Sequence, residues 1–370
     1  MPSHIANPYA GIDWKNQIRL QGATHMHCPT DEIFQNALAE GLDFATFSNY
    51  YPSLPCCPAA SMRKNTARMK LPYYVQNGKL VKQELDYRKF FLDHGATPPA
   101  DLPEEEGGQL FSNVPPDLLE APNAEHHYFT DTSVYLHVTA PGSTFVSGRP
   151  RFKNDILAQE GIRLGVGMPW REGFSAILDS LVTPDGGGII VNHPQWSHHP
   201  VDFLCEMLDY DERVLGLEVV NTDCSATYTS GAEPQWDAVL STGRQCWGFC
   251  TPDHYNGREW RGRSILLPEE RTVESCLRAY RQGRFYGAIR GQGLSFERIE
   301  FDGKTLRVRC DKEAIILLIS SVGVVKELWT GQELTYTLSE GDREKHRFFR
   351  VTAEDQQSRE KLYTQPIMLV

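Results

Sequence analysis

Histidines gather in this chain where short apolar segments end or where an acidic residue stands beside them. Seven of the twelve histidines occupy such positions, far more than an even scatter would place there. Imidazole nitrogens and carboxylate oxygens are the ligands that proteins offer to zinc, manganese and iron. If the fold brings these positions together, they can hold a metal ion. The histidines are His25, His27, His126, His127, His137, His193 and His254.

His25 and His27 form the sharpest of these patterns. They are two residues apart at the end of an apolar run, and the period-two geometry of a strand places both side chains on one side. Two imidazoles facing the same way make half of a metal site. A His-x-His pair alone is also typical of a strand end whose imidazoles hydrogen-bond within the protein. Glu125 before His126 and Asp253 before His254 add the carboxylates that favour the metal interpretation.

Segments that could position these side chains recur through roughly the first 290 residues. Short runs of three to six apolar or β-branched residues predict buried strands of a parallel sheet. They occupy residues 18–23, 44–47, 134–136, 188–191, 215–220 and 247–250.

Helical patterns lie between the apolar runs. Apolar residues recur at helix-face spacing, and Asp31 and Gly41 suit the two ends of the first helix. Strands that alternate with helices predict βα units that can close into a barrel, whose chemistry lies at the carboxyl ends of the strands. The predicted helices cover residues 31–40, 174–181, 201–208, 236–240 and 273–281.

Two regions lack this alternation of predicted strands and helices. Residues 51–116 are rich in proline and tyrosine and hold three consecutive glutamates, so they form either a solvated surface excursion or a lid that shapes substrate choice. From about residue 291 the chain predicts strands without long helices, among them residues 305–310 and 314–321, with a hairpin turn at Asp302-Gly303. We therefore expect a hydrolase barrel over residues 1–290, with an insertion at about 51–116, and a small antiparallel β-sandwich-like domain over 291–370.

The composition limits the kinds of partner that we expect the protein to bind. The formal net charge is -11, and an acidic surface argues against binding nucleic acid or an anionic membrane. The first 14 residues lack the pattern of a signal peptide, and no apolar run reaches the ~20 residues that cross a membrane. The nine cysteines show no zinc-finger spacing and predict reduced core residues. We expect a cytoplasmic protein that acts on a small molecule.

The order of these motifs resembles the PHP (polymerase and histidinol phosphatase) family of metal-dependent phosphoesterases, over roughly residues 15 to 290. The later segments, up to Thr364-Gln365-Pro366-Ile367, resemble the β-rich tail of a PHP subgroup that includes carbamate- and ester-cleaving members. The matching motifs are His25-x-His27, Gly41-Leu42-Asp43, Glu125, Leu136-His137, His193-Pro194, Glu218-x-x-Asn221 and the region 248–254 that ends in Asp253-His254.

This resemblance implies an α/β fold with a distorted (β/α)7 TIM-like barrel. It also implies one or two divalent ions of zinc, manganese or iron. Two positions depart from the family: Tyr50 stands where a histidine ligand is usual, and Pro252 stands where an aspartate is usual. We therefore expect fewer ions than the family's cluster of up to three. The ligands that the resemblance implies are His25, His27, Glu125, His193 and His254.

A hydrolase with this site needs further roles, and we assign them as hypotheses. Asp253 and His137 are the expected catalytic residues, Asp253 by orienting a metal-bound water and His137 by completing a second metal position. Asn49, Tyr50 and Arg258 are the expected substrate-binding residues. Three functions stay open: a phosphoesterase that uses a metal-bound water, a hydrolase of carboxylic or carbamate esters or amides on the same site, and a degenerate barrel that binds a ligand without catalysis.

Overall fold

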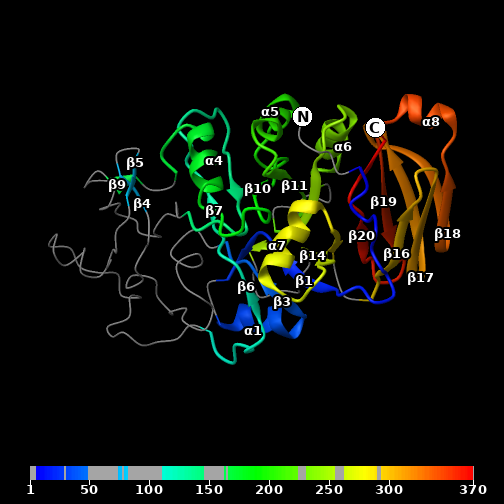
Figure 1. Ribbon diagram of the computed structural model, residues 1–370, viewed down its shortest axis with the longest axis horizontal. Helices are drawn as coiled ribbons and strands as arrows, with labels where there is room; N and C mark the ends of the chain where they lie inside the picture. Colours follow the sequence, from blue (N-terminus) through cyan, green and yellow to red (C-terminus); the bar gives the residue numbers. More distant parts are fainter. Residues whose placement is uncertain are drawn as a thin grey trace.

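The computed structural model of the chain describes residues 6–28, 31–48, 74–76, 79–81, 111–145, 162–163, 166–223, 231–254, 262–289 and 293–369. Figure 1 shows a mixed α/β protein in which a few helices accompany large sheets. Of the expected insertion at 51–116, only residues 111–116 and the short strands β4 (Tyr74–Gln76) and β5 (Lys79–Val81) are described; these two strands form a small sheet with β9 (Ile162–Arg163). Its two interpretations therefore stay predictions.

One sheet holds five strands in the order β12–β11–β10–β8–β7. β10, β11 and β12 run parallel, as the apolar runs predict, whereas β8 and β7 join the sheet in antiparallel pairing. All eight residues of β11 are buried, because other parts of the protein cover both faces of the sheet. The strands are β7 (Glu125–His126), β8 (Val138–Thr139), β10 (Ile189–Val191), β11 (Val214–Asn221) and β12 (Trp247–Thr251).

The expected strand at 134–136 is wrong. Leu136 is buried, but Tyr135 beside it is 70% exposed, and strand pairing begins only at Val138, after His137. A short apolar run indicates that the segment is buried, but by itself it does not distinguish a strand from a loop that packs on the core. His137 therefore precedes β8 instead of following a strand.

A second sheet contains eleven strands and combines two kinds of pairing. β1, β3 and β6 are parallel neighbours, and β14 is antiparallel to β1. The order continues through β15 into the later strands β20 (Lys361–Tyr363), β19 (Phe348–Glu354), β17 (Thr305–Ser320) and β16 (Phe296–Phe301). Its first five strands are β1 (Leu20–Ala23), β3 (Leu42–Ala45), β6 (Leu119–Glu120), β14 (Gly262–Leu266) and β15 (Phe285–Ile289).

Buried polar contacts tie the two sheets together near the ends of their strands. The side-chain amide of Asn123 donates to the carbonyls of Thr24 and Thr46 (both 2.8 Å) and accepts from the backbone N–H of Ala140 (2.9 Å). A two-stranded parallel pair, β2 (Met26–His27) with β13 (Asp253–His254), lies at the same ends. Within the described ranges strand pairing does not close a ring, so the (β/α)7 barrel remains a prediction.

All five predicted helices are present. The last begins at the Thr272 cap, whose side chain accepts from the N–H of Ser275, and ends at Gly283, where a φ of 69° suits glycine. None of the helices in the described part of the chain combines the length and apolar character that a membrane-spanning helix needs. The helices are α1 (Asp31–Ala39), α4 (Trp170–Leu178), α5 (Val201–Tyr210), α6 (Glu233–Ser241) and α7 (Val273–Gln282).

The later strands are all antiparallel and gather at one end of the molecule (Figure 1). The predicted Asp302-Gly303 turn joins the first two, with a φ of 88° at the glycine. The two strands expected at 305–310 and 314–321 are one strand, because a register shift between Arg309 and Ala314 absorbs the polar interruption. The elements are β16 (Phe296–Phe301), β17 (Thr305–Ser320), β18 (Val324–Thr337), α8 (Glu340–Lys345), β19 (Phe348–Glu354), β20 (Lys361–Tyr363) and β21 (Ile367–Met368).

Strand pairing continues across the expected domain boundary. β20 pairs with β15, so one sheet contains strands from both sides of residue 290. A buried ion pair adds a second link, since the Arg350 guanidinium of β19 contacts the Asp237 carboxylate of α6 at 2.7 Å. The division at 290 stays a prediction.

Candidate metal centre

Two short parallel strands bring four of the predicted site residues together. His27 of β2 pairs in register with His254 of β13, and Met26 pairs with Asp253. The backbone N–H of Asp253 donates to the carbonyl of His25 (3.0 Å), which fixes the two segments against each other. The His-x-His and Asp-His motifs, distant in the sequence, therefore lie side by side.

Four donor atoms converge at this place. The Nε2 atoms of His25 and His27 are 3.2 Å apart. Glu125 Oε2 lies 3.3 and 3.0 Å from these two nitrogens, and Asp253 Oδ1 lies 3.2 and 3.4 Å from them. Each carboxylate oxygen therefore forms a triangle with the two imidazole nitrogens. The two triangles share the side that joins His25 Nε2 to His27 Nε2. Bonds of about 2.1 Å to a zinc ion set neighbouring ligands about 3.0–3.4 Å apart in octahedral or tetrahedral geometry, so these triangles have the size of coordination faces.

The second oxygen of Glu125 serves another pair of histidines. Its Oε1 lies 2.8 Å from His137 Nδ1 and 3.4 Å from His193 Nε2. Glu125 is fully buried and therefore lies between two donor groups. Among the residues that the structure describes, four sets of three bring their donor atoms within 4.8 Å of one another. They are His25–His193–Asp253, His25–His27–Glu125, His27–Asp253–His254 and Glu125–His137–His193.

Glu218 orients one of the donors. The His25 Nδ1–H donates to Glu218 Oε1 at 2.7 Å, and because a carboxylate only accepts, the neutral ring keeps a lone pair on Nε2, toward the cluster. Glu218 Oε2 accepts from the backbone N–H of His193 (2.7 Å) and from the amide of Asn221 (3.0 Å). Asn221 also donates to Asp253 Oδ2 at 2.7 Å. Glu218 and Asn221 thus hold three of the donors in place.

The backbone is strained at two donors. His193 has a φ of 28° and Asp253 a φ of 59°, in the region that residues with a side chain rarely adopt. Such conformations cost about 1–3 kcal/mol each and persist where the surroundings enforce them, commonly at functional sites. Here they turn both side chains toward Glu125 and His25.

The charges of the cluster are strongly coupled. Burial opposes protonation of His25, but carboxylates led by Asp253 outweigh it and raise the pKa of His25 well above its ordinary value. Burial also opposes ionisation of Glu125 and Asp253, yet neighbouring histidines led by His25 lower the pKa of both carboxyls. Buried carboxylates that stay ionised need nearby positive charge, which a divalent cation supplies.

The site residues therefore fit a divalent metal ion. Imidazole nitrogens and carboxylate oxygens form a donor set that zinc, manganese and iron share. Solvent reaches the cluster at His137 and His254, which we call its opening. Their side chains are 15% and 37% exposed, while the other donors are at most 5% exposed.

All seven residues predicted to bind metal or to act in catalysis lie in this cluster. Asp253, which was predicted only to orient a metal-bound water, has a carboxylate oxygen placed among the candidate ligand atoms. Asn49, Tyr50 and Arg258 lie outside the described residues, so their substrate-binding roles stay predictions. The seven are His25, His27, Glu125, His137, His193, Asp253 and His254.

The sequence predicted no role for Glu218 or Asn221, although both stood in a matched motif. Residues three apart in a regular strand face opposite sides. The pairing of β11 with β12 shifts register between Glu218 and Val220, and this bulge turns Asn221 to the side of Glu218. A bulge of this kind leaves no clear sequence signal.

Comparisons with known proteins assign no family. No protein-family model and no curated protein matches this chain. Among solved structures, a two-domain protein from Bacteroides vulgatus that contains a predicted PHP-like metal-dependent phosphoesterase is 12% identical, with a TM-score of 0.38 over 93% of this chain and 91% of that chain. This similarity is too low to support an argument, and the function of the chain is therefore inferred from the geometry of its site.

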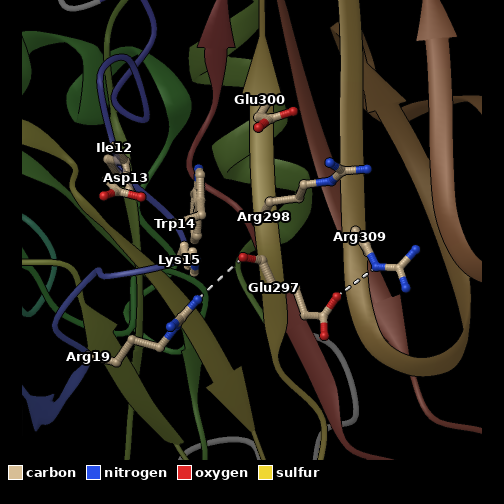
Figure 2. A pocket seen from close by; sticks show the side chains of 9 residues that line it. All are labelled: Ile12, Asp13, Trp14, Lys15, Arg19, Glu297, Arg298, Glu300 and Arg309. Carbon is tan, nitrogen blue, oxygen red and sulfur yellow. Dashed lines mark hydrogen bonds and ion pairs between the residues drawn. The ribbon is translucent and has the colours of Figure 1, made fainter.

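A separate hollow of about 810 Å³ lies between the N-terminal segment and strands β16 and β17 (Figure 2). Two of its charged side chains contact each other, since Arg309 pairs with Glu297 at 2.6 Å, and Arg19 donates to the backbone carbonyl of Glu297 at 3.3 Å. None of the seven residues of the metal centre lines it, so the two places are distinct. Its lining residues are Ile12, Asp13, Trp14, Lys15, Arg19, Glu297, Arg298, Glu300 and Arg309.

Proposed function

We propose that this chain is a metal-dependent hydrolase that cleaves a small phosphate ester. The observation that carries the proposal is Glu125, which faces His25 and His27 with one oxygen and His137 and His193 with the other. A carboxylate shared in this way suits two neighbouring ions, an arrangement that serves in-line displacement at phosphorus. The PHP-like barrel belongs to the same proposal.

The ligands divide between two positions. His25, His27 and Asp253 would hold one ion, and His137 and His193 a second, with Glu125 common to both. When bound, such ions polarise a phosphoryl oxygen and lower the pKa of water.

The chain's other contribution is to orient these groups. Glu218 keeps the proton of His25 on Nδ1, so that the lone pair of Nε2 faces the other proposed ligands of the same ion. Asn221 donates to Oδ2 of Asp253, and Oδ1 of the same carboxylate then faces the Nε2 atoms of His25 and His27. Burial and nearby His27 lower the pKa of His254 to about 4, so its ring is uncharged at neutral pH and offers a nitrogen at the opening.

The proposed substrate is a small molecule. The net charge of -11 leads us to expect neither nucleic acid nor an anionic membrane as a partner, because phosphate backbones and acidic lipids require clustered basic residues.

The test begins with metal content. Protein purified without a histidine tag should contain at least one divalent ion per chain, and after loading with manganese or zinc it should hydrolyse p-nitrophenyl phosphate faster than p-nitrophenyl acetate. Less than about 0.3 ion per chain, without rescue by added metal, would favour a non-catalytic module. Faster cleavage of the acetate would favour an ester hydrolase.

The Glu125→Gln variant tests the shared carboxylate. It should lose metal and at least tenfold in turnover, because a Gln side chain has one oxygen where two are needed. His346→Gln is the control, since His346 contacts Asp342 and Phe349 among the later elements. Full metal content and turnover in Glu125→Gln would contradict the proposal.

A further inference from the structure

Two aromatic side chains stand exposed at the opening of the metal centre. Tyr135 is 70% and Trp196 is 49% exposed. Their ring centroids are 6.4 Å apart with an interplanar angle of 38°. Single exposed aromatics are ordinary on a protein surface, but two that face one small space form a local apolar surface.

Both rings adjoin donors of the centre. The Trp196 ring lies 5.0 Å from that of His193 and 6.1 Å from that of His137, and the Tyr135 ring lies 6.4 Å from His137. His137 is one of the two partly exposed donors, so the aromatic pair lies beside a point at which solvent reaches the cluster.

The backbone at Trp196 is held in place by its own loop. Backbone hydrogen bonds from Ser197 to His193 (3.1 Å), from His198 to Gln195 (3.1 Å) and from His199 to Pro194 (2.9 Å) form compact turns around it. A loop whose backbone is fixed before binding loses little entropy when a ligand binds to it. The turns thus allow a ligand to stack on the indole without rearrangement of the loop backbone.

We propose that the substrate of this site carries an aromatic ring that stacks against Trp196 and Tyr135 while its ester group reaches the metal centre. This inference rests on the proposed function and adds the class of the leaving group. In an aryl phosphate a single bridging oxygen separates ring and phosphorus, which matches a ring surface in direct contact with two ligand histidines. Uncharged aromatic faces favour a flat apolar ring over a short alkyl chain, because offset stacking adds to the burial of area.

Calorimetry of two non-hydrolysable probes on manganese-loaded protein tests this without turnover. Benzylphosphonate, in which a CH2 group replaces the bridging oxygen, should bind more tightly than methylphosphonate. Trp196→Ala should weaken benzylphosphonate binding about five- to tenfold, the size of one aromatic pair, and leave methylphosphonate within twofold. Trp196→Phe should retain most of the preference.

Trp329→Ala is the matched control, because Trp329 is 50% exposed on β18, a strand of the antiparallel region. If both phosphonates bind equally well and Trp196→Ala alters neither, the aromatic inference fails while the proposed function stands. If neither phosphonate binds to metal-loaded protein, the proposed function fails together with the inference.

Discussion

Replacing Glu218 with glutamine tests how the centre is oriented without removing a ligand. The side chain keeps its shape, but one oxygen becomes an NH₂ group. Glu218 accepts from His25 with Oε1 and from His193 and Asn221 with Oε2, so both oxygens are occupied. A glutamine can satisfy only one of these two sides.

Each orientation of the glutamine has a cost. If its NH₂ faces His25, the imidazole must carry its proton on Nε2 and loses the lone pair that faces the cluster. If the NH₂ faces His193 and Asn221, buried donors meet donors, at about 1–3 kcal/mol for each group left unsatisfied. Loss of a carboxylate that orients a ligand histidine typically weakens metal binding about 10- to 100-fold.

The assay is a competition titration with a chelating indicator, using zinc or manganese, on Glu218→Gln and on the unaltered chain. Circular dichroism shows whether the fold is retained. Glu360→Gln is the control: Glu360 is also buried and accepts from the backbone N–H of Gly293 at 2.7 Å, outside the metal centre. Metal affinity in Glu218→Gln within twofold of the unaltered chain would refute the role of Glu218.

Three further predictions concern protons and stability. The pKa of His25 is raised because carboxylates outweigh its burial, so its stabilising contribution to the metal-free fold is full below about pH 6.5 and is lost as pH rises through the raised pKa. Metal must displace this proton, so binding should strengthen with pH, and calorimetry in two buffers should show proton release; none would contradict the charge assignment. Asp237→Ala leaves Arg350 buried without its carboxylate and should cost about 3–5 kcal/mol in urea unfolding, whereas a loss below about 1 kcal/mol would show that water replaces the pair. Gln365→Ala removes bonds to both the N–H (2.7 Å) and C=O (2.8 Å) of Gly248 and should cost about 2 kcal/mol or more, with an unchanged unfolding midpoint as the contrary result.

Local sequence patterns predicted many of the helices and strands. Helix periodicity, together with caps such as Thr272, located five helices, because an amphipathic face and its end signals are written within about ten residues. They failed at 134–136 and at 305–321. In the first case burial came from a loop, and in the second a register shift joined two strands into one, so in both the outcome depended on neighbouring strands.

The sequence by itself determined which residues could hold a metal and that His25 and His27 face the same way, since strand periodicity is a local property. Only the tertiary structure decided that Glu125 divides its oxygens between two donor groups and that Glu218 and Asn221 orient the ligands. These contacts join residues from 12 to 193 positions apart. The contact of Asn221 with Asp253 also depends on a bulge in β11. Their distances follow from how strands pair across sheets, which no single segment of the chain encodes.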